Sequence, residues 1–358
     1  MLSTIANDTK VLIKKIIKII FSGLGFEIKK KSKIKLISKA LVSFEKYAVF
    51  TTSAGTQIDL LKGYKNYIWP ESFDEMIKSH SIPNEKFIKR NKIIIKNNDR
   101  LKKISDLLKI FGFNYFNKNV LEVGCMNGSL TYLFSDNGAK LADGIDLAET
   151  FDVEEKYAMS LNPKIYKHMS FLEYYQKGVG KHFDNQTVSK TRFFNSNIES
   201  YKPDVLYDYI FSYATFEHLM NPINALKNMY NILKKGGVCI HIYHPFFCED
   251  GAHFDCFDFP WGHVRLSEKD IKKYINQYWS EDSEMMSHRL FNTINRMTLA
   301  DLRTYSLSAG FEILLLQNNY NLHSNRMDEK IFWQSKEIYN NLCLEDCLSG
   351  SVTIVLKK

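Results

Sequence analysis

The stretch VLEVGCMNGSL, residues 120–130, decides the fold. Its apolar start predicts a buried strand that ends at Gly124, and a helix is expected to begin near Gly128. Glycines in such a turn let the backbone approach a ligand, and the first turn of a helix offers unpaired N–H groups. Asp146 ends the next apolar run, ADGIDL, at a spacing where a carboxylate can accept hydrogen bonds from both hydroxyls of a ribose.

Two classes of nucleotide-like cofactor use this arrangement. A dinucleotide site needs the pattern G-x-G-x-x-G, which would place glycines at positions 126 and 129. This chain has Met126 and Ser129 there, which argues against pyrophosphate binding.

Strand and helix patterns alternate on both sides of the turn. Apolar runs predict strands at 119–124, 140–146, 191–195, 207–213, 238–243, 311–316 and 351–356, and helical spacing is found at 91–111, 129–135, 222–233 and 298–309. This alternation predicts an α/β fold, with a mostly parallel sheet and helices on both faces.

The residues Glu122-x-Gly124-Cys125-x-Asn127-Gly128 resemble the first motif of class I S-adenosylmethionine-dependent methyltransferases. Five further stretches resemble later motifs of that family in the right order: Asp146 as the ribose-binding acid, Ser196-Asn197-Ile198-Glu199 as the adenine-edge loop, YDYIFSYATFEHLMNP (207–222), LKKGGVCIHIYHP (233–245), and SAGFEILLL (308–316) with the final SVTIVLKK. One such motif is weak evidence, whereas six in register are strong.

The resemblance implies a Rossmann-like seven-stranded sheet and S-adenosylmethionine as cofactor. By resemblance, the cofactor-binding residues are Glu122, Gly124, Cys125, Asn127, Gly128, Asp146, Leu147, Asn197, Ile198 and Tyr213. Two positions depart from the family. Met126 replaces the usual middle glycine, and Asn197 stands where an aspartate usually accepts from the adenine amino group, which an asparagine carbonyl could also do.

The same pattern predicts three parts of the chain. Residues 1–90 form a basic, helical N-terminal extension, and residues 91–246 and 297–358 form the cofactor-binding core. Residues 247–296, after the fifth strand, interrupt the alternation and form an insertion, expected to be a lid that binds the methyl acceptor.

The net charge of +8 is concentrated at the N-terminus, since residues 1–46 carry eleven lysines and three acidic residues. The neutral remainder argues against a nucleic-acid substrate. Residues 11–28 predict a basic amphipathic helix. Either this helix lies on an anionic membrane surface, as part of a membrane-binding segment at 10–35, or it packs on the rest of the protein. Sparse cysteines and the absence of a signal peptide or spanning segment favour a reduced, cytoplasmic protein, with the inner membrane face as an alternative site.

An alcohol acceptor is a poor nucleophile at neutral pH, so methyl transfer to it needs a general base, most often histidine. His244 and His263 are the preferred candidates, and His218 is a third with a commonly structural role in the family. Trp261 and Arg265, beside His263, are candidates for binding a sugar ring and its polar groups. His244, Cys248, His253 and Cys256 resemble metal ligands in content, but their irregular intervals and the lack of a CxxC pair lead us to expect no metal site.

These observations predict an S-adenosylmethionine-dependent methyltransferase that methylates a hydroxyl of a sugar or glycoconjugate precursor. Two alternatives stay open at this point. One is a methyltransferase for a small aromatic or lipid-like metabolite, which would require a mostly apolar cleft. The other is a non-catalytic protein that binds S-adenosylmethionine and serves as a scaffold. The identity of the acceptor and the oligomeric state are not encoded in these patterns.

Overall fold

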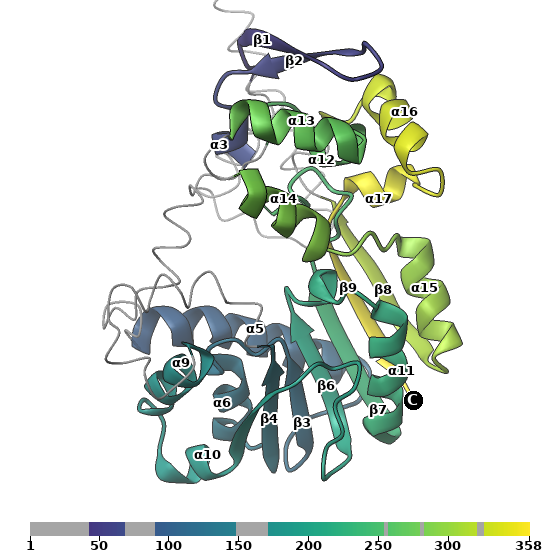
Figure 1. Cartoon of the computed structure of the whole chain (residues 1–358). Coiled ribbons are helices and arrows are strands. Elements are labelled where there is room, and N and C mark those ends of the chain that lie inside the picture. The colour runs from purple at the N-terminus through teal and green to yellow at the C-terminus, as the bar shows by residue number, and fades with distance from the viewer. Residues whose placement is uncertain (1–42, 69–89, 148–170, 254–256, 280–282, 321–325) are drawn as a thin grey trace, which may run out of the picture. The chain divides into compact units, whose positions relative to one another are not determined.

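A seven-stranded sheet forms around the stretch at 120–130 (Figure 1). Its strands are β3 (Asn119–Val123), β4 (Leu141–Asp146), β5 (Thr191–Asn195), β6 (Tyr207–Tyr213), β7 (Leu233–Tyr243), β8 (Glu312–Tyr320) and β9 (Ser349–Lys357). The strand order is β5-β4-β3-β6-β7-β9-β8. The pairs from β5 to β7 are parallel, and β9 runs antiparallel to both of its neighbours. The predicted mostly parallel, Rossmann-like sheet is therefore confirmed.

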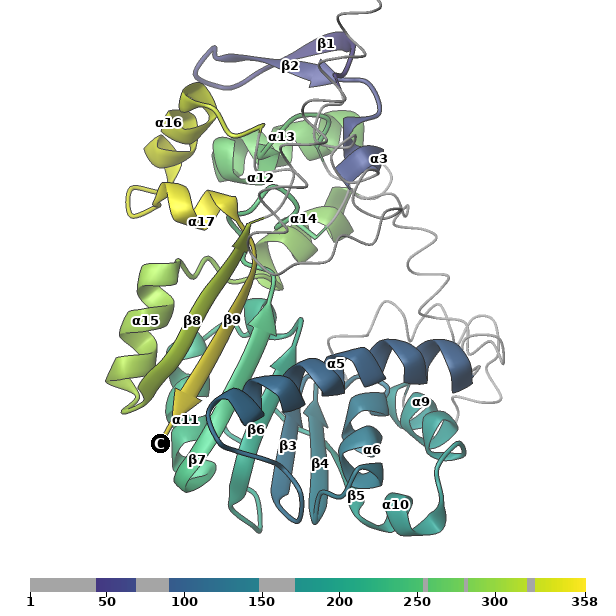
Figure 2. The ribbon, with the colours of Figure 1, turned by 180° about the vertical axis from the view of Figure 1, so that it is seen from behind.

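Helices cover both faces of this sheet, because successive side chains of a buried strand point to opposite sides. Val120 packs with α5 (Arg90–Ile110) and α6 (Ser129–Asp136), whereas its neighbour Leu121 packs with α11 (Pro222–Ile232) and α15 (Leu299–Ser308). Figure 2 shows α5 crossing the strands on its face. Two shorter helices, α9 (Phe171–Gly180) and α10 (Asn185–Ser189), precede β5.

Local sequence explains where the helices on the second face begin. Asn221 caps α11 by accepting a hydrogen bond from the Asn224 N–H, and Pro222 occupies the first turn, where no N–H partner is needed. Thr298 begins α15 with a capping box to Asp301. The Lys-Lys-Gly-Gly segment at 234–237, which lies between the predicted helix at 222–233 and the predicted strand at 238–243, belongs to β7, which starts at Leu233.

A second apolar cluster lies outside the sheet layers. It is built from the hairpin β1 (Lys46–Thr51) and β2 (Gln57–Leu61), the segment from Phe246 to Ile294, and residues 331–347. Its helices are α12 (Gly262–Arg265), α13 (Glu268–Tyr278), α14 (Ser283–Asn292), α16 (Glu329–Ile338) and α17 (Leu344–Leu348), and the short α3 (Tyr64–Ile68) follows the hairpin.

This cluster changes the expected organisation in two places. Residues 46–61 form an antiparallel hairpin instead of part of a helical extension, because Phe50, Ile58 and Leu60 alternate with exposed residues and bury one face. Residues 329–348, expected within the cofactor-binding core, pack with the insertion after β7. The insertion therefore has a substantial hydrophobic core that includes chain from both ends of the sequence.

The computed structural model describes residues 43–68, 90–147, 171–253, 257–279, 283–320 and 326–358. The predicted basic helix at 11–28 lies outside these residues, as does Cys256. None of the helices within the described ranges has both the length and the apolar character needed to cross a membrane.

Candidate functional site

The turn after β3 has the backbone geometry that its glycines make accessible. Gly124 has φ +74° and Gly128 has φ +72°, conformations that residues with a Cβ rarely adopt. A Cβ on Gly124 would overlap the Thr215 side chain, and one on Gly128 would overlap the Phe193 ring. Met126 takes φ +43° between them, so the turn retains its shape without the usual middle glycine.

Asp146 closes this turn from the neighbouring strand. Its carboxylate accepts hydrogen bonds from the N–H groups of Met126, at 2.7 Å, and Leu147, at 2.8 Å. Burial raises the pKa of Asp146 to about 6, although both hydrogen bonds oppose that shift. The predicted turn residues and the predicted acid are therefore brought together, with Leu147 directly beside the acid.

Buried polar groups support the turn from below. Glu122 accepts a hydrogen bond from the Thr131 hydroxyl on α6, and its burial raises its pKa to about 8. Cys125 is buried beneath the turn. The Asn127 carboxamide oxygen accepts the N–H of Ser129, at 3.0 Å, and so caps the start of α6. Glu122, Cys125 and Asn127 thus hold the turn in place.

Two residues that the sequence analysis did not select also contact this region. Gln176 on α9 donates a hydrogen bond to the Met126 carbonyl at 3.0 Å. The guanidinium of Arg100 on α5 lies 4.2 Å from the centroid of the Tyr213 ring, whose residue ends β6. Both come from helices whose sequence carries only helical spacing, so no local signal marks them.

The predicted adenine-edge loop follows β5. Asn197 accepts the N–H of Glu199 at 2.9 Å through its side-chain oxygen, and Ile198 is buried in the core of the sheet. The Asn197 oxygen retains a second lone pair that could accept from an adenine amino group. A polar hollow of about 440 Å³ adjoins this loop on the side of α11, lined by Asn197, Glu199, Ser200, Asn224, Lys227, Asn228 and Asn231.

The segment after β6 connects the glycine turn to the insertion. Thr215 faces Gly124, and the 3₁₀ turn η2 (Phe216–His218) follows it. Asn295 clamps η2, since its side chain donates to the carbonyls of Phe216, at 2.8 Å, and Leu219, at 2.9 Å, and its N–H donates to the Glu217 carbonyl. These hydrogen bonds hold the backbone that carries the polar side chains of η2.

Of the three predicted histidines, two lie at this edge of the sheet. The Nδ1 atom of His218 is 2.7 Å from the Thr293 carbonyl, and the Nδ1 atom of His244 is 2.7 Å from the Gly350 carbonyl. A carbonyl can only accept, so each Nδ1 carries the proton and each Nε2 keeps its lone pair. Both are exposed residues, although burial of its ring lowers the pKa of His218.

The structure corrects the prediction for His263 and its neighbours. His263 is only 1% exposed and its Nε2 lies 2.8 Å from the Phe246 carbonyl, inside the second apolar cluster. Burial lowers its pKa to about 4. Trp261 is also buried and donates its Nε1–H to the Phe247 carbonyl, while Arg265 donates to Gln334 and to the Pro260 carbonyl. These three residues hold the insertion together instead of facing an acceptor.

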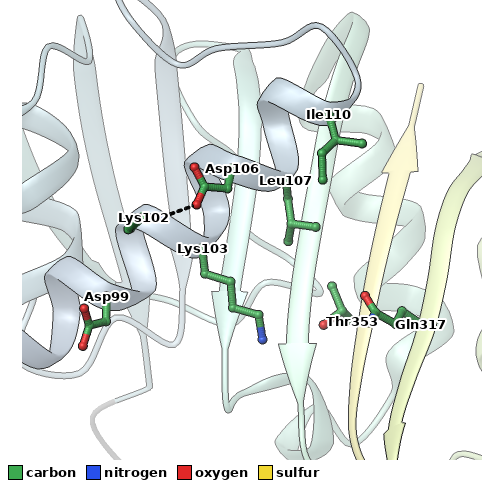
Figure 3. A pocket seen from close by; sticks show the side chains of 8 residues that line it. All are labelled: Asp99, Lys102, Lys103, Asp106, Leu107, Ile110, Gln317 and Thr353. Atoms are coloured by element: carbon green, nitrogen blue, oxygen red, sulfur yellow. Dashed lines mark hydrogen bonds and ion pairs between the residues drawn. The ribbon is translucent and has the colours of Figure 1, made fainter. Parts of the chain in front are cut away.

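A further hollow, of about 310 Å³, lies between α5 and the strands β8 and β9 (Figure 3). Figure 3 shows its charged rim, where Lys102 and Asp106 form an ion pair. Its lining residues are Asp99, Lys102, Lys103, Asp106, Leu107, Ile110, Gln317 and Thr353. None of the predicted site residues is among them, so this hollow is separate from the glycine turn.

The arrangement at the glycine turn fits S-adenosylmethionine. The backbone of Gly124 and Gly128 leaves no room for a side chain, and the Asp146 carboxylate stands at the end of the adjacent strand, where it can accept from a ribose. Asn197 and Ile198 follow the next strand along the same edge. The three elements that such a cofactor needs therefore come from three consecutive strands, β3, β4 and β5.

Comparison with known proteins agrees with this geometry. The family model described as "Methyltransferase domain" matches residues 96–316, which is more than half of the chain. No curated protein sequence matches the chain.

Three of the solved structures that are similar to this chain are the following. A protein from Listeria monocytogenes assigned to the S-adenosylmethionine-dependent methyltransferases shares 17% identity at a TM-score of 0.41, with 71% of this chain and 96% of that chain covered. The S-adenosylmethionine-dependent methyltransferase from Mesorhizobium loti shares 11% identity at 0.39, with 71% and 96% covered. Magnesium protoporphyrin IX methyltransferase from Synechocystis, with bound SAH, shares 12% at 0.37, with 75% and 86% covered.

These likenesses are too distant to carry a conclusion about the acceptor. The family match, by contrast, spans the glycine turn, Asp146, the Asn197 loop and the turn after β6. The chain therefore belongs to the methyltransferase-domain family, as a class I enzyme that methylates with S-adenosylmethionine.

Proposed function

We propose that the methyl acceptor is a hydroxyl group of a sugar or a sugar-containing precursor, and that His244 is the general base. One observation carries this proposal. The His244 ring is solvent-accessible, and its Nδ1–H bond to the Gly350 carbonyl leaves the Nε2 lone pair available for a proton. A base of this kind is needed for an alcohol, whereas nitrogen, phenol or thiol acceptors need less help.

The surroundings of His244 support a polar acceptor. The main-chain N–H of His244 lies 3.4 Å from a carboxylate oxygen of Glu217, and His218 and His253 are close to that carboxylate. An acceptor with several hydroxyls can hydrogen-bond to such groups. A small aromatic or lipid-like acceptor would leave them without partners, at a cost of about 1–3 kcal/mol for each buried group.

The cofactor and the residues of the chain would contribute different parts of the reaction. Bound S-adenosylmethionine supplies an electrophilic methyl group on a sulfonium. The chain would align the acceptor hydroxyl with that methyl, and His244 Nε2 would take the hydroxyl proton as the oxygen–methyl bond forms and the sulfur–methyl bond breaks. Because β3, β6 and β7 are parallel neighbours, the cofactor turn, η2 and His244 all follow the carboxyl ends of adjacent strands.

An acceptor screen with S-adenosylmethionine labelled in its methyl group tests the proposal. The purified chain is incubated with nucleotide sugars, lipid-linked sugars, phenols, fatty acids and short oligonucleotides, and label transfer is measured. We expect transfer to a sugar-containing acceptor, in a linkage stable to mild alkali as an ether is. Faster transfer to phenols or fatty acids would overturn the sugar assignment, and transfer to none while the cofactor still binds would favour the scaffold alternative.

We also propose that residues 10–35 attach the enzyme to an anionic membrane surface, where sugar precursors carried on lipids would be accessible. Each lysine near such a surface contributes about 1 kcal/mol of attraction. The test compares the full chain with a chain lacking residues 1–35 on vesicles with and without anionic lipid. We expect the deletion to spare cofactor binding and abolish vesicle binding, and vesicle binding that survives the deletion would refute this attachment.

A further inference from the structure

Three side chains that can bind a metal converge at the end of β6. Glu217, His218 and His253 each present one candidate ligand atom, and these atoms all lie within 4.8 Å of one another. Glu217 and His218 come from η2, whereas His253 comes from the insertion after β7. The fold therefore brings together ligands from two separate segments, without any spacing motif in the sequence.

His218 is oriented as metal-binding histidines usually are. Its Nδ1–H donates to the Thr293 carbonyl at 2.7 Å, which fixes the tautomer and leaves the Nε2 lone pair for a ligand. The backbone beneath it is held by Asn295, which bonds to both ends of η2. The ring position is thus set before any ion arrives, and its binding would cost little reorganisation.

His253 faces the same point from the insertion. Its ring centroid lies 5.2 Å from that of His218, and the two rings are nearly perpendicular. The Nε2 atom of His253 is buried and has no hydrogen-bond partner among the described residues. Its residue adopts φ +60°, an uncommon conformation for a side chain with a Cβ that is often found at functional sites.

Glu217 completes the group with a buried carboxyl group that lacks a partner on one oxygen. The residue is 1% exposed, and within the described part of the chain its Oε2 atom has no hydrogen-bond partner. Its other oxygen receives a long contact of 3.4 Å from the His244 N–H. A buried carboxylate in this condition is costly unless a cation or a proton compensates it. The two nearby imidazole nitrogens are themselves candidate ligands for a cation.

We infer that Glu217, His218 and His253 bind one divalent first-row transition metal ion, with Zn²⁺ the ion that their donor set matches best. Two imidazole nitrogens and one carboxylate oxygen are a known catalytic zinc set, in which a fourth position stays open for water or substrate. This assignment differs from the sequence expectation of no metal site, because the set considered there was His244, Cys248, His253 and Cys256, which omits Glu217 and His218. Cys248 instead bonds to the Pro245 carbonyl and Asp250.

The position of the ion gives it a role that rests on the proposed function. η2 lies between two contacts. Thr215, just before η2, contacts Gly124 in the glycine turn, and Glu217 within η2 contacts the His244 N–H. An acceptor hydroxyl at the open position would have its pKa lowered by the ion, which would help His244 to remove its proton. Metal binding itself does not require this role, so the two statements can fail separately.

The test measures metal binding without reference to activity. The full chain is prepared without a polyhistidine tag, stripped with a chelator, and titrated with Zn²⁺ alone by calorimetry and with Co²⁺ alone by its visible absorption. We expect one ion per chain, and an absorption typical of four- or five-coordinate Co²⁺. If neither Zn²⁺ nor Co²⁺ binds, the metal site is wrong. A proton on Glu217 would then compensate for the burial of its carboxyl group.

Variants locate the ion. In metal sites generally, substitution of a residue that hydrogen-bonds to a ligand weakens metal binding about 10–100-fold. Removal of a ligand itself, by His253→Ala or His218→Ala, should therefore weaken Zn²⁺ binding at least about 100-fold. The isosteric Glu217→Gln removes the charge with little change in shape and should also weaken Zn²⁺ binding. His288→Ala, which removes an exposed histidine of α14, is the matched control and should bind as the wild type does.

Binding of S-adenosylmethionine to each variant confirms that it is folded. A folded His253→Ala chain that binds Zn²⁺ as tightly as the wild type would overturn the assignment. If Zn²⁺ binds as expected but methyl transfer is unaffected by chelation, the site stands and only its role in the proposed reaction fails.

Discussion

The turn after β3 and the turn after β6 are built in opposite ways. In the first, the critical positions of Gly124, Met126 and Gly128 lie within five consecutive residues, and backbone angles define the site. In the second, Glu217 and His218 gain their neighbours His253, Thr293 and Asn295 from the insertion, so that a distant segment helps to define the site. One turn is specified locally, and the other is specified by the fold.

This difference separates two functions. A locally specified turn can bind the same cofactor with many different surroundings, because its glycines make the required φ angles accessible wherever the turn occurs. A site assembled from an insertion can change its substrate whenever the insertion changes. We therefore expect substitutions at the first turn to affect cofactor affinity, and substitutions at the second to affect methyl transfer with little change in that affinity.

His244→Ala should have the largest effect. Loss of a general base lowers the rate of proton transfer by about 10²–10⁴-fold, so kcat should fall by that amount while the Kd for S-adenosylmethionine is unchanged. Initial rates with the acceptor found in the screen, and calorimetry with the cofactor, measure the two quantities. His288→Ala is the matched control. A kcat within a few-fold of the wild type would show that another group accepts the proton.

Gly124→Ala tests the locally specified turn. The new Cβ would overlap Thr215 in a backbone conformation with φ +74°, and we expect S-adenosylmethionine to bind at least about tenfold more weakly, because the turn would leave its binding geometry to relieve the overlap and a strain of about 1–2 kcal/mol. Gly112→Ala is a close control, because it has φ +77° with nothing within 4 Å of the new atom. Equal affinity in both variants would mean that contact with Thr215 does not shape the cofactor turn.

Asp146 should make cofactor binding depend on pH. Burial raises its pKa to about 6, and only the ionised carboxylate can accept from both ribose hydroxyls, so affinity should fall roughly tenfold per pH unit below that value. Fold stability should change in the opposite direction. Because the folded pKa is raised above 3.8, stability from this group is present at low pH and is lost as pH rises through about 6.

Calorimetry and denaturant unfolding between pH 5 and pH 8 measure these two trends. Asp146→Asn should remove both and weaken binding at neutral pH by about 10–100-fold, the value of a charge-assisted hydrogen bond. If the variant keeps the pH dependence of the wild type, another group is responsible for it.

The sequence predicted the fold and the first turn because both depend on short-range patterns. The strands at 191–195 and 207–213 were located to the residue, because the regular alternation of strands and helices indicates where each one falls. Gly124 and Asp146 were found from the ends of two apolar runs, the spacing between them and the resemblance to the methyltransferase motifs. Arg100, Gln176 and Glu217 were missed because a polar residue on a helix or turn carries no sign of which distant segment it faces. His263, Trp261 and Arg265 were misassigned for the same reason, since burial within an insertion is not visible in its composition.

His263→Phe should have the smallest effect on function and the clearest effect on stability. It leaves the buried Phe246 carbonyl without its donor, and we expect unfolding to become about 1–3 kcal/mol easier while kcat and cofactor affinity stay unchanged. The pKa of His263 in the wild type is lowered from 6.5 to about 4, so the wild type loses stability as pH falls through this range. The difference in unfolding free energy between the wild type and the variant should therefore narrow. Denaturant unfolding at pH 8 and pH 5 measures the gap, with the exposed His288→Phe as control. If kcat fell sharply in a variant of unchanged stability, His263 would be restored as the base, and the distinction between the core of the insertion and its catalytic edge would fail.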